Sequence, residues 1–410
     1  MEKHILILTT TNDFLGKFEQ ENVRILQQRG YVVHYATNIH EPHYFSDLER
    51  LHKMHVIVHP IEIARSPFMI QDNQKALRQI VGLLQKYPIQ AIHCHTPVGG
   101  LLGRLAGRLC PGKNIVVLYT AHGFHFYRNA PFINHLVYYR VEKLLARYTD
   151  ILIVINEEDY RSARKFRLKK NGSLYKLPGV GLDRQIFRPV SQQERKTLRD
   201  RLGIGDEIFF LLSIGELNEN KNHRVVLEAL ARLRRMHKDI SAIRYGICGD
   251  GFFRQHMERW IAEMGLEDNV ILYGHRTDIP QMIGCADATV FPSKREGLGM
   301  AGLESLAMGI PVIASDNRGS REYMEHGKNG FVYRYDDIDG FAQGIEAMKK
   351  LCPQKRKRMA ACCVASVKPF DQEYASALMR RVYTDMERRI EAEAYEKDKQ
   401  GRDQYHYGRV

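Results

Sequence analysis

The sequence predicts an α/β protein made of two doubly wound domains, each a parallel sheet with helices on both faces. Short apolar runs alternate with segments of helical periodicity, which is the pattern of βαβ units. This alternation occurs once in each half of the chain, and a stretch rich in glycine and proline at 177–190 separates the two series. The length of 410 residues also exceeds what one hydrophobic core usually holds.

In the first half, each predicted strand is an apolar run, and each predicted helix has apolar residues three or four positions apart. The predicted strands are 4–9, 31–36, 55–59, 91–94, 115–120 and 151–155. The predicted helices are 14–28, 73–86, 100–109 and 133–147. Ligands bind at the carboxyl ends of parallel strands, so residues that follow these strands are candidates for a site.

The second half repeats the pattern. Its predicted strands are 208–213, 243–248, 270–273, 288–291 and 312–314. Its predicted helices are 222–237, 253–264, 300–308 and 338–349. Two such sheets whose carboxyl ends face each other would form a cleft between the domains.

Composition excludes several classes of protein. Hydrophobic residues make up 44% of the chain and charged residues 27%, which is ordinary for a globular protein and unlike disordered, collagen or coiled-coil chains. The apolar runs are far shorter than the ~18–20 residues of a membrane span. The first ten residues resemble a strand more than an export signal. Seven scattered cysteines without zinc spacing are typical of a reduced, cytoplasmic protein.

The net charge of +13 is unevenly distributed. Residues 1–190 carry 26 basic and 15 acidic side chains, so nearly all of the excess lies there. Basic residues are densest at 161–170. Such a run is either a solvated face or a contact with nucleic acid, an anionic membrane or an anionic substrate. The imbalance indicates that the two halves meet different partners.

The most informative segment is 291–304, FPSKREGLGMAGLE. A strand ends at Phe291, a turn with two glycines follows, and a helix opens near Met300. Glycines let the backbone approach a ligand, and a helix N-terminus offers N–H groups to an anion. Glu296 and Glu304 flank the turn and suit a ligand with both phosphates and hydroxyls. The alternative is one capping and one solvent-facing glutamate, but Glu304 lies in an apolar run, which favours the functional interpretation.

This segment, PS-x-x-EGLG-x-x-x-LE, resembles the signature of retaining glycosyltransferases of family 4, which have the GT-B fold of two Rossmann-like domains facing across a cleft. Other segments resemble the family in the expected order: GELNENK at 215–221, GDG at 249–251, Gly274, GIPVIA at 309–314 and NG at 329–330. The resemblance covers roughly residues 3–385. It implies an acceptor-binding domain at 1–188, a donor domain at 189–365, and a C-terminal helix at 366–410 that crosses back to the first domain and ends in a charged tail.

The resemblance also implies roles for residues of the donor domain. Lys221 would hold the donor diphosphate and act in catalysis with Glu296, which would contact the transferred sugar, while Glu304 would bind the ribose hydroxyls. Further donor contacts are implied for Gly299, Met300, Ala301, Gly215, Gly249, His275 and Arg276. Lys221 follows a strand and opens a helix, so its charge and the helix N–H groups favour the same anion. Its alternative is a surface lysine at a helix start.

The chain departs from the family at Glu216, where arginine is common. A carboxylate facing a diphosphate would repel it. We therefore expect either that Glu216 points elsewhere or that another cation, Lys294 or Arg295, takes the place of the arginine.

Histidines follow two predicted strands of the first half. The resemblance places His122, within YTAHGFH at 119–125, against the donor sugar as a catalytic residue. His95 and His125 are candidate contacts to the acceptor or the sugar. The pattern His93-x-His95 also fits a metal site, but no cysteine or carboxylate pattern completes it. Hydrogen-bonded histidines without a metal are the favoured interpretation.

The loop after the first strand contains Gly16, where many relatives are richer in glycine. Thr10 in this loop is a candidate donor to the acceptor or sugar, and capping of the next helix is an equal alternative. The triplet Asp337-Ile-Asp339 matches the D-x-D motif of metal-dependent glycosyltransferases of a different fold. It lies at a predicted helix start, so we interpret it as a cap.

The segment 132–147 combines apolar and basic residues at helical spacing. A helix that faces the core is one interpretation, and a surface helix near anionic lipid is the other. The resemblance favours the second, because related enzymes act on lipid-linked acceptors at the cytoplasmic face of the membrane.

The resemblance implies a retaining transferase that moves a hexosyl or N-acetylhexosaminyl group from a nucleotide sugar, by default a UDP-sugar, to a glycan acceptor in surface-polysaccharide synthesis. Neither a cofactor nor a metal is expected. We expect a cytoplasmic protein, peripheral on the inner face of the plasma membrane. The alternatives are a nucleotide-sugar epimerase of similar architecture and a basic nucleic-acid binder, which lacks a supporting motif. A dinucleotide-dependent oxidoreductase is disfavoured because neither half contains G-x-G-x-x-G after a strand.

Overall fold

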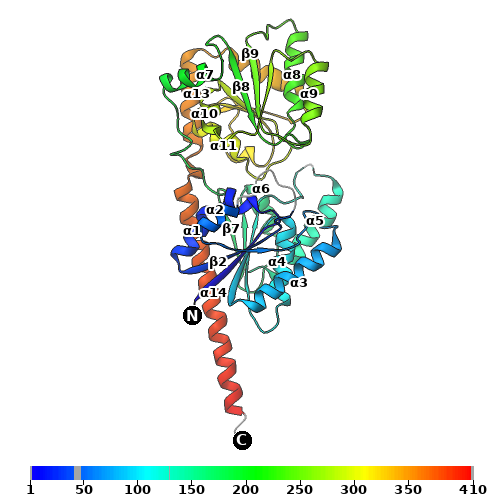
Figure 1. Ribbon diagram of the computed structural model, residues 1–410, viewed down its shortest axis with the longest axis vertical. Helices are drawn as coiled ribbons and strands as arrows, with labels where there is room; N and C mark the ends of the chain where they lie inside the picture. Colours follow the sequence, from blue (N-terminus) through cyan, green and yellow to red (C-terminus); the bar gives the residue numbers. More distant parts are fainter. Residues whose placement is uncertain (1, 41–47, 129, 408–410) are drawn as a thin grey trace. The chain divides into compact units, whose positions relative to one another are not determined.

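The computed structural model describes residues 2–40, 48–128 and 130–407 (Figure 1). The chain divides into two compact units. The first combines Met1–Val180 with Glu373–Val410, and the second is Gly181–Gln372.

The unit boundaries differ from the boundaries expected at 188 and 365. Residues 181–188 belong to the second unit, and the reason lies in the backbone around Leu182. Its N–H donates to the carbonyl of Phe370 at 2.8 Å, and the N–H of Gln372 donates to the carbonyl of Leu182 at 3.1 Å. This pairing ties both crossing segments to the second unit.

The first unit, within the described residues, contains a parallel sheet of seven strands in the order β3-β2-β1-β4-β5-β6-β7. The strands are β1 (Lys3–Leu8), β2 (Tyr31–Thr37), β3 (Ile57–Pro60), β4 (Ile89–His95), β5 (Val116–Ala121), β6 (Ile151–Val154) and β7 (Ser173–Lys176). The sequence predicted six of these and missed β7, whose residues, SLYK, do not form an apolar run. Growth of the sheet reverses at β1, so the loops after β1 and β4 diverge at the carboxyl edge.

Helices cover both faces of this sheet. They are the π-helical turn η1 (Leu15–Glu19), α1 (Gln20–Gln28), α2 (Leu48–Lys53), α3 (Ile70–Lys86), α4 (Pro97–Leu109), α5 (Phe132–Leu145), η2 (Ala146–Tyr148), α6 (Glu157–Ala163) and the C-terminal helix α14 (Gln372–Tyr407), red in Figure 1. The region expected to be a charged tail is helical as far as Tyr407.

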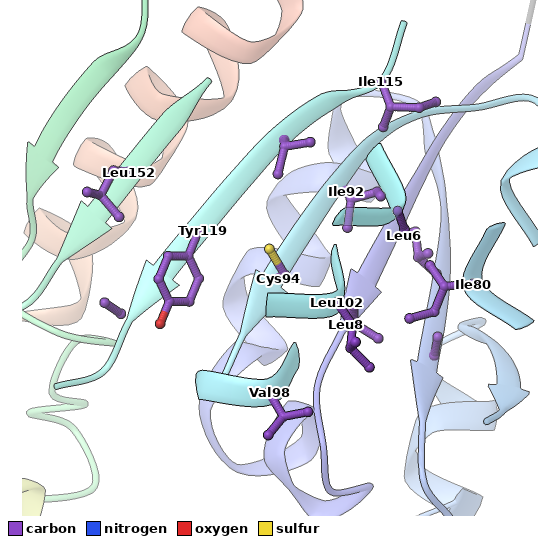
Figure 2. Close-up of a cluster of buried hydrophobic side chains, with 14 of the residues drawn as sticks. Leu6, Leu8, Ile80, Ile92, Cys94, Val98, Leu102, Ile115, Tyr119 and Leu152 are labelled. Carbon is purple, nitrogen blue, oxygen red and sulfur yellow. The ribbon is translucent and has the colours of Figure 1, made fainter. Parts of the chain in front are cut away.

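Alternate residues of β1 enter two separate cores. Leu6 and Leu8 pack with residues of α3, β4 and α4 on one face, and Figure 2 shows Ile80, Ile92 and Leu102 in this cluster. Ile5 and Ile7 pack on the other face, where α14 contributes Met379, Val382, Tyr383 and Met386. Each fully buried aliphatic side chain stabilises the fold by about 1.5–3 kcal/mol. The C-terminal helix is therefore part of the first unit's core.

The second unit, within the described residues, contains a parallel sheet of six strands in the order β10-β9-β8-β11-β12-β13. The strands are β8 (Phe209–Ile214), β9 (Ile243–Cys248), β10 (Val270–Gly274), β11 (Ala288–Phe291), β12 (Val312–Ser315) and β13 (Gly330–Tyr333). The helices are α7 (Gln192–Arg201), α8 (Arg224–Arg235), α9 (Arg254–Glu263), α10 (Ile279–Cys285), α11 (Met300–Ala307), η3 (Ser320–Glu322), α12 (Ile338–Lys349), α13 (Pro353–Ser366) and η4 (Lys368–Phe370).

Asp337 caps α12 as the sequence predicted. Its Oδ1 accepts the N–H of Gly340 at 2.8 Å, which satisfies one free donor of the first turn. Asp339 instead accepts a hydrogen bond from Arg232 of α8 at 2.7 Å.

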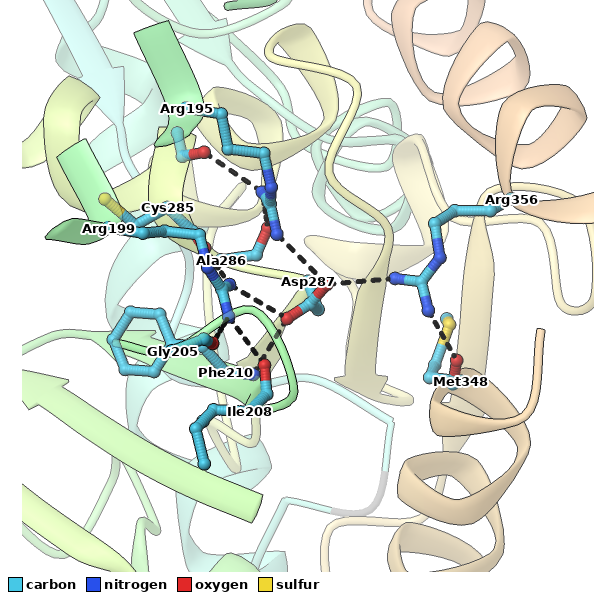
Figure 3. A network of polar contacts seen from close by, with 11 residues as sticks. Arg195, Arg199, Gly205, Ile208, Phe210, Cys285, Ala286, Asp287, Met348 and Arg356 are labelled. Atoms are coloured by element: carbon cyan, nitrogen blue, oxygen red, sulfur yellow. Dashed lines mark hydrogen bonds and ion pairs between the residues drawn. The ribbon is translucent and has the colours of Figure 1, made fainter. Parts of the chain in front are cut away.

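Asp287 joins two helices to the amino end of β11 (Figure 3). Its carboxylate accepts from Arg195 and Arg199 of α7 at 3.0 and 3.2 Å and from Arg356 of α13 at 3.2 Å. The N–H of Phe210 also donates to it, at 2.9 Å. The network lies at the strand ends opposite the carboxyl edge, where it holds the helices on the sheet.

No helix within the described residues has the length and apolar character needed to cross a bilayer.

Candidate functional site

The sheet of the second unit reverses its direction of growth between β8 and β11, which pair directly. The loops that follow these strands, 215–223 and 292–299, leave from the same carboxyl edge. Ligands of open α/β sheets bind at such a position. Several residues singled out in the sequence lie on these two loops.

Lys221 and Glu296 join the two loops. The Nζ of Lys221 donates to Oε1 of Glu296 at 2.7 Å and lies 5.7 Å from the centre of the Phe291 ring. The backbone N–H of Lys221 is held by Oδ1 of Asn218 at 2.9 Å. Both charged side chains are mostly buried, so the pair is less screened than one on an open surface. The structure thus places two predicted site residues in direct contact.

The turn before α11 depends on a glycine. Gly299 has a φ of 90°, and a Cβ at this position would lie 2.5 Å from the ring of Phe291. The hydroxyl of Tyr323 donates to the carbonyl of Gly299 at 3.1 Å and holds the turn. Among the residues that the structure describes, no side chain caps α11, so the N–H groups of Met300 and Ala301 are left for an anion.

Glu304 lies one turn into α11 and is partly buried. Burial raises the pKa of its carboxyl to about 7. Within the described part of the chain, this carboxyl has no hydrogen-bond or ion-pair partner. Partial burial of a carboxyl without a partner carries a desolvation cost that a bound ligand would offset. The structure therefore supports the functional interpretation of Glu304 over a solvent-facing one.

Gly215 and Gly249 allow three strand ends to approach closely. The N–H of Gly215 donates to the carbonyl of Cys248 at 3.0 Å, and that of Gly249 donates to the carbonyl of Gly274 at 2.8 Å. A Cβ on Gly249 would lie 1.9 Å from the carbonyl oxygen of Gly215. Packing of the backbone thus explains Gly249 without a ligand, whereas a Cβ on Gly215 would lie 3.2 Å from the side chain of Lys221.

The loop after β10 carries His275 and Arg276. The guanidinium of Arg276 donates to both carboxylate oxygens of Asp278, at 2.8 and 2.6 Å. His275 is exposed. Asp278 therefore neutralises the charge that Arg276 would offer to a nucleotide-sugar donor. Glu216 is also exposed, and the two alternatives foreseen for it stay predictions.

A buried cation near Glu296 was missed in the sequence. Arg318, in the turn after β12, is 5% exposed, and its Nε donates to the carbonyl of Glu296 at 3.2 Å. Of the two cations proposed to compensate for Glu216, Lys294 pairs with Glu219 at 2.9 Å. Arg318 follows a different strand, and no pattern in the sequence links it to Glu296.

In the first unit, histidines converge at the carboxyl edge of the sheet. Nδ1 of His95, the last residue of β4, lies 3.1 Å from Nε2 of His122, which follows β5. Nδ1 of His95 also lies 3.5 Å from Oε1 of Glu19, the last residue of η1. The ring of Phe14 packs against both imidazoles. Glu19 was not foreseen, because only the π-helical turn brings its side chain beneath the histidines.

Burial shifts the protonation of this cluster. It raises the pKa of Glu19 to about 8 and lowers that of His122 to about 4. The pKa of His95 is also lowered by burial and by its histidine neighbours. A small cavity of about 30 Å³, large enough for about two water molecules, adjoins Glu19, Thr120 and His122. At neutral pH, His122 is thus an uncharged imidazole beside this small cavity.

Glu19, His93 and His95 supply the carboxylate that the sequence pattern lacked for a metal site. Among the described residues, their ligand atoms lie within 4.8 Å of one another. However, the ring nitrogens of His93 are engaged by the hydroxyls of Tyr383 at 3.2 Å and Thr120 at 2.8 Å. This arrangement accounts for His93 as a hydrogen-bonded histidine.

The remaining predicted residues of the first unit lie apart from this pair of histidines or are packed into the fold. His125 packs against Tyr138 of α5, with ring centres 4.9 Å apart. Thr10 is buried, and Gly16 lies inside η1, where its carbonyl accepts from Gln20. These contacts do not bring the three residues together.

Two family models match the chain. The model described as "Glycosyl transferase 4-like" matches residues 4–156, and the model described as "Glycosyl transferases group 1" matches residues 194–361.

Curated relatives agree with these models. The chain is 39% identical to the putative glycosyltransferase EpsD of Bacillus subtilis, over 85% of this chain and 88% of the relative. It is 29% identical to UDP-Gal:alpha-D-GlcNAc-diphosphoundecaprenol alpha-1,3-galactosyltransferase of Escherichia coli, over 69% of this chain and 72% of the relative.

Solved structures share the fold at low sequence identity. Anabaena HepE in complex with UDP and glucose superposes with a TM-score of 0.74 at 18% identity, covering 93% of this chain and 99% of the other. Sucrose-phosphate synthase of Thermosynechococcus elongatus superposes with a TM-score of 0.73 at 19% identity, covering 94% and 99%. The two parallel sheets are thus those of the GT-B fold. Together with the family models and the relatives, this places the chain in the glycosyltransferase family that combines a 4-like first domain with a group 1 second domain.

Proposed function

We propose that this glycosyltransferase is a retaining enzyme that moves a sugar from a UDP-sugar to a lipid-linked glycan in surface-polysaccharide synthesis. The observation that carries the proposal is the arrangement around α11. A partly buried carboxyl without a partner among the described residues, a mostly buried lysine and an uncapped helix start follow two adjacent strands of one sheet. This set offers hydrogen-bond acceptors for hydroxyls and donors for a diphosphate.

In this proposal, Glu304 binds the ribose hydroxyls and Lys221 binds the diphosphate. The N–H groups of Met300 and Ala301 face the same anion, because the N-terminus of α11 carries a partial positive charge. Lys221 must then exchange Glu296 for a phosphate oxygen, or bind both. Glu296, once it is released, can accept from hydroxyls of the transferred sugar.

The chemical step follows from these roles. The bond between the anomeric carbon and the phosphate oxygen breaks, and a bond to the acceptor oxygen forms on the same face of the sugar. The acceptor proton passes to the leaving phosphate oxygen. Lys221 and the N–H groups of α11 stabilise the charge that develops on the diphosphate. His122, uncharged at neutral pH, offers a hydrogen bond to a sugar hydroxyl.

The names of similar proteins support the choice of substrates. The Escherichia coli relative is named for a UDP-galactose donor and a diphosphoundecaprenol-linked acceptor. HepE has been solved with UDP, with UDP-glucose, and with UDP and glucose. A UDP-sugar and a lipid-linked glycan are therefore the first substrates to test.

A membrane contact is part of the proposal, and its support is the outer face of α5. Phe132, Ile133 and Leu144 are 79%, 58% and 54% exposed. The carboxylate of Glu142, on the inner face, is taken by the buried Arg104 at 2.7 Å. The outer face therefore combines apolar side chains with the exposed basic residues Arg140 and Lys143, followed by Arg147 of η2, none of which has an ion-pair partner among the described residues.

The basic run at 161–170 is a weaker candidate for a membrane contact than the sequence suggested. Lys169 pairs with Asp150 and with Glu393 of α14, both at 3.1 Å, and Arg161 pairs with Glu157 at 3.0 Å. Lys169 thus links α14 to the rest of the first unit, and the run has no large exposed apolar side chain, so α5 is the better candidate for contact with anionic lipid.

The test begins with thermal unfolding of the full chain in the presence of a panel of nucleotide sugars, because a bound donor stabilises by mass action. The stabilising donor is then incubated with a lipid-linked acceptor, and the anomeric configuration of the product is read by NMR. Retention with transfer supports the proposal. Isomerisation of the donor without an acceptor would instead identify an epimerase. Inversion, or no stabilisation by any UDP-sugar, would refute the retaining UDP-sugar assignment.

A further inference from the structure

The buried chain of Glu19, His95 and His122 in the first unit has no role in the function proposed so far, except through His122. Asn22 donates to Oε2 of Glu19 at 2.5 Å, which leaves Oε1 facing Nδ1 of His95 at 3.5 Å. Nδ1 of His95 in turn faces Nε2 of His122 at 3.1 Å. Both Glu19 and His95 are almost fully buried. Nδ1 of His95 thus faces both the Glu19 carboxyl and the inward-facing nitrogen of His122, so one proton on this atom serves both contacts.

The contact between the two imidazoles requires one donor and one acceptor. If Nδ1 of His95 donates, Nε2 of His122 accepts, and neutral His122 carries its proton on Nδ1. If Nε2 of His122 donates, the proton of His95 must lie on its own Nε2. That atom is buried and has no partner within the described residues. An orphaned N–H in such a place is unfavourable, so the first arrangement is preferred.

Glu19 reinforces this preference when it is ionised. A proton on Nδ1 of His95 faces an acceptor at Oε1, whereas a lone pair there would face another lone pair. We propose that Glu19 is a positioning residue that acts through His95 to keep the proton of His122 on Nδ1, so that His122 is a hydrogen-bond donor to its ligand. What that donor does rests on the proposed function, because a sugar hydroxyl is the ligand assigned to His122.

Among the neighbouring groups, Glu19 is the one whose charge determines which nitrogen of His95, and therefore of His122, carries the proton. Besides the two histidines of the chain, the titratable groups that face it are His93 of β4 and Tyr383 of α14. His93 is held between the hydroxyls of Tyr383 and Thr120, which occupy both of its nitrogens. Phe14 packs against His95 and His122 and contributes no charge.

The direct test reads the protonated nitrogen of His122 by NMR of full-length protein labelled with ¹⁵N-histidine, with the resonance assigned from His122→Gln. At about pH 9, where Glu19 is mostly ionised, wild type should be protonated on Nδ1. Glu19→Leu should move a substantial fraction of the proton to Nε2. Glu19→Gln keeps an acceptor oxygen that does not titrate, so His122 should stay protonated on Nδ1 at every pH. Glu21→Gln, a carboxylate on α1 beside the same cavity, is the matched control.

An unchanged His122 signal in folded Glu19→Leu would overturn the proposal. So would stoichiometric binding of Zn²⁺ to wild type that is lost in Glu19→Leu, because the cluster would then be a metal site. Unfolding curves for each variant establish that the comparison is made between folded proteins.

Turnover separates this inference from the proposed function. Glu19→Leu should lower kcat about ten-fold with little change in donor KM, and Glu19→Gln should recover activity and lose the pH dependence near 8. If the NMR result is as expected but His122→Ala retains full activity, the role of His122 in transfer fails while the role of Glu19 stands. If His122→Ala is inactive and the NMR signal ignores Glu19, only the present inference fails.

Discussion

Lys221 donates to Glu296 at 2.7 Å and so links the loop after β8 to the loop after β11. The two residues lie 75 positions apart in the chain. Each was assigned to a different part of the donor, and the contact makes their roles interdependent. A phosphate that binds Lys221 competes with Glu296 for the same ammonium group.

Lys221→Ala should weaken UDP binding about 10- to 100-fold, because one charge-assisted hydrogen bond to a diphosphate contributes about 1.5–3 kcal/mol. Glu296→Ala should leave UDP binding equal or tighter, since it removes the competitor, while transfer falls. Isothermal titration with UDP measures the affinity of each variant. Lys294→Ala removes a neighbouring lysine that pairs with the exposed Glu219 and should change little. UDP binding by Lys221→Ala at the wild-type level would contradict the assignment.

Glu304→Gln should change how stability depends on pH. The carboxyl titrates near 7 in the folded chain and near 4.5 when unfolded, so folded protein binds more protons between these values. The free energy of unfolding of wild type therefore falls as pH rises from about 4.5 to 7 and then levels off. The glutamine variant lacks this loss and should be more stable at pH 8, by about 2 kcal/mol after allowance for partial exposure.

Urea unfolding at about pH 5 and pH 8 tests this prediction. The control is Glu263→Gln, on the exposed side of α9, which should keep the wild-type slope. The same variant Glu304→Gln should bind UDP less well, as expected for a residue whose burial serves a ligand and not the fold. If the free energies of unfolding of wild type and Glu304→Gln change with pH in the same way, the Glu304 carboxyl does not have a raised pKa in the folded protein.

Asp287→Ala should destabilise the second unit by about 3–5 kcal/mol, because it leaves Arg195, Arg199 and Arg356 without their common partner. Thermal or urea unfolding measures the loss. Asp316→Ala breaks a two-hydrogen-bond pair with Arg321 on the surface and should cost under about 1 kcal/mol. Equal losses in the two variants would show that the network in Figure 3 adds nothing beyond a surface pair.

The outer face of α5 should bind anionic vesicles. Ile133→Asp and Lys143→Glu should each reduce cosedimentation with vesicles rich in acidic lipid, and added salt should weaken wild-type binding. Met236→Asp places the same charge on an apolar side chain that is 49% exposed in the second unit, and it should have no effect. Binding that is insensitive to both α5 substitutions would remove this surface from the proposal.

The fold could be predicted because its central strands are continuous apolar runs. β1, β4 and β5 are buried on both faces, and each was located to within a few residues. β7 and β13 lie at sheet edges and are mostly only partly buried, so they lack this signal. The expectation that the two domains face each other across a cleft stays a prediction.

The candidate site was predictable only where one segment carries it. The turn and helix at 291–304 contain Glu296, Gly299 and Glu304 in a single stretch, and their pattern was readable. Arg318 and Glu19 could not be found, because each reaches its neighbours through tertiary contacts between separate strands or through an irregular turn. Periodicity describes which face a residue occupies, and it does not describe which distant residue it meets.

The return of α14 to the first unit has a consequence for the order in which the protein can fold. Residues 181–372 are continuous and can form their sheet and cores as soon as they leave the ribosome. The first unit begins earlier but remains incomplete until Met379, Val382, Tyr383 and Met386 cover one face of its sheet. Tyr383 also completes the hydrogen bonds of His93. The histidine cluster is therefore completed only after residues 373–386 have been synthesised, and a nascent chain truncated before residue 373 would expose an apolar sheet face to aggregation.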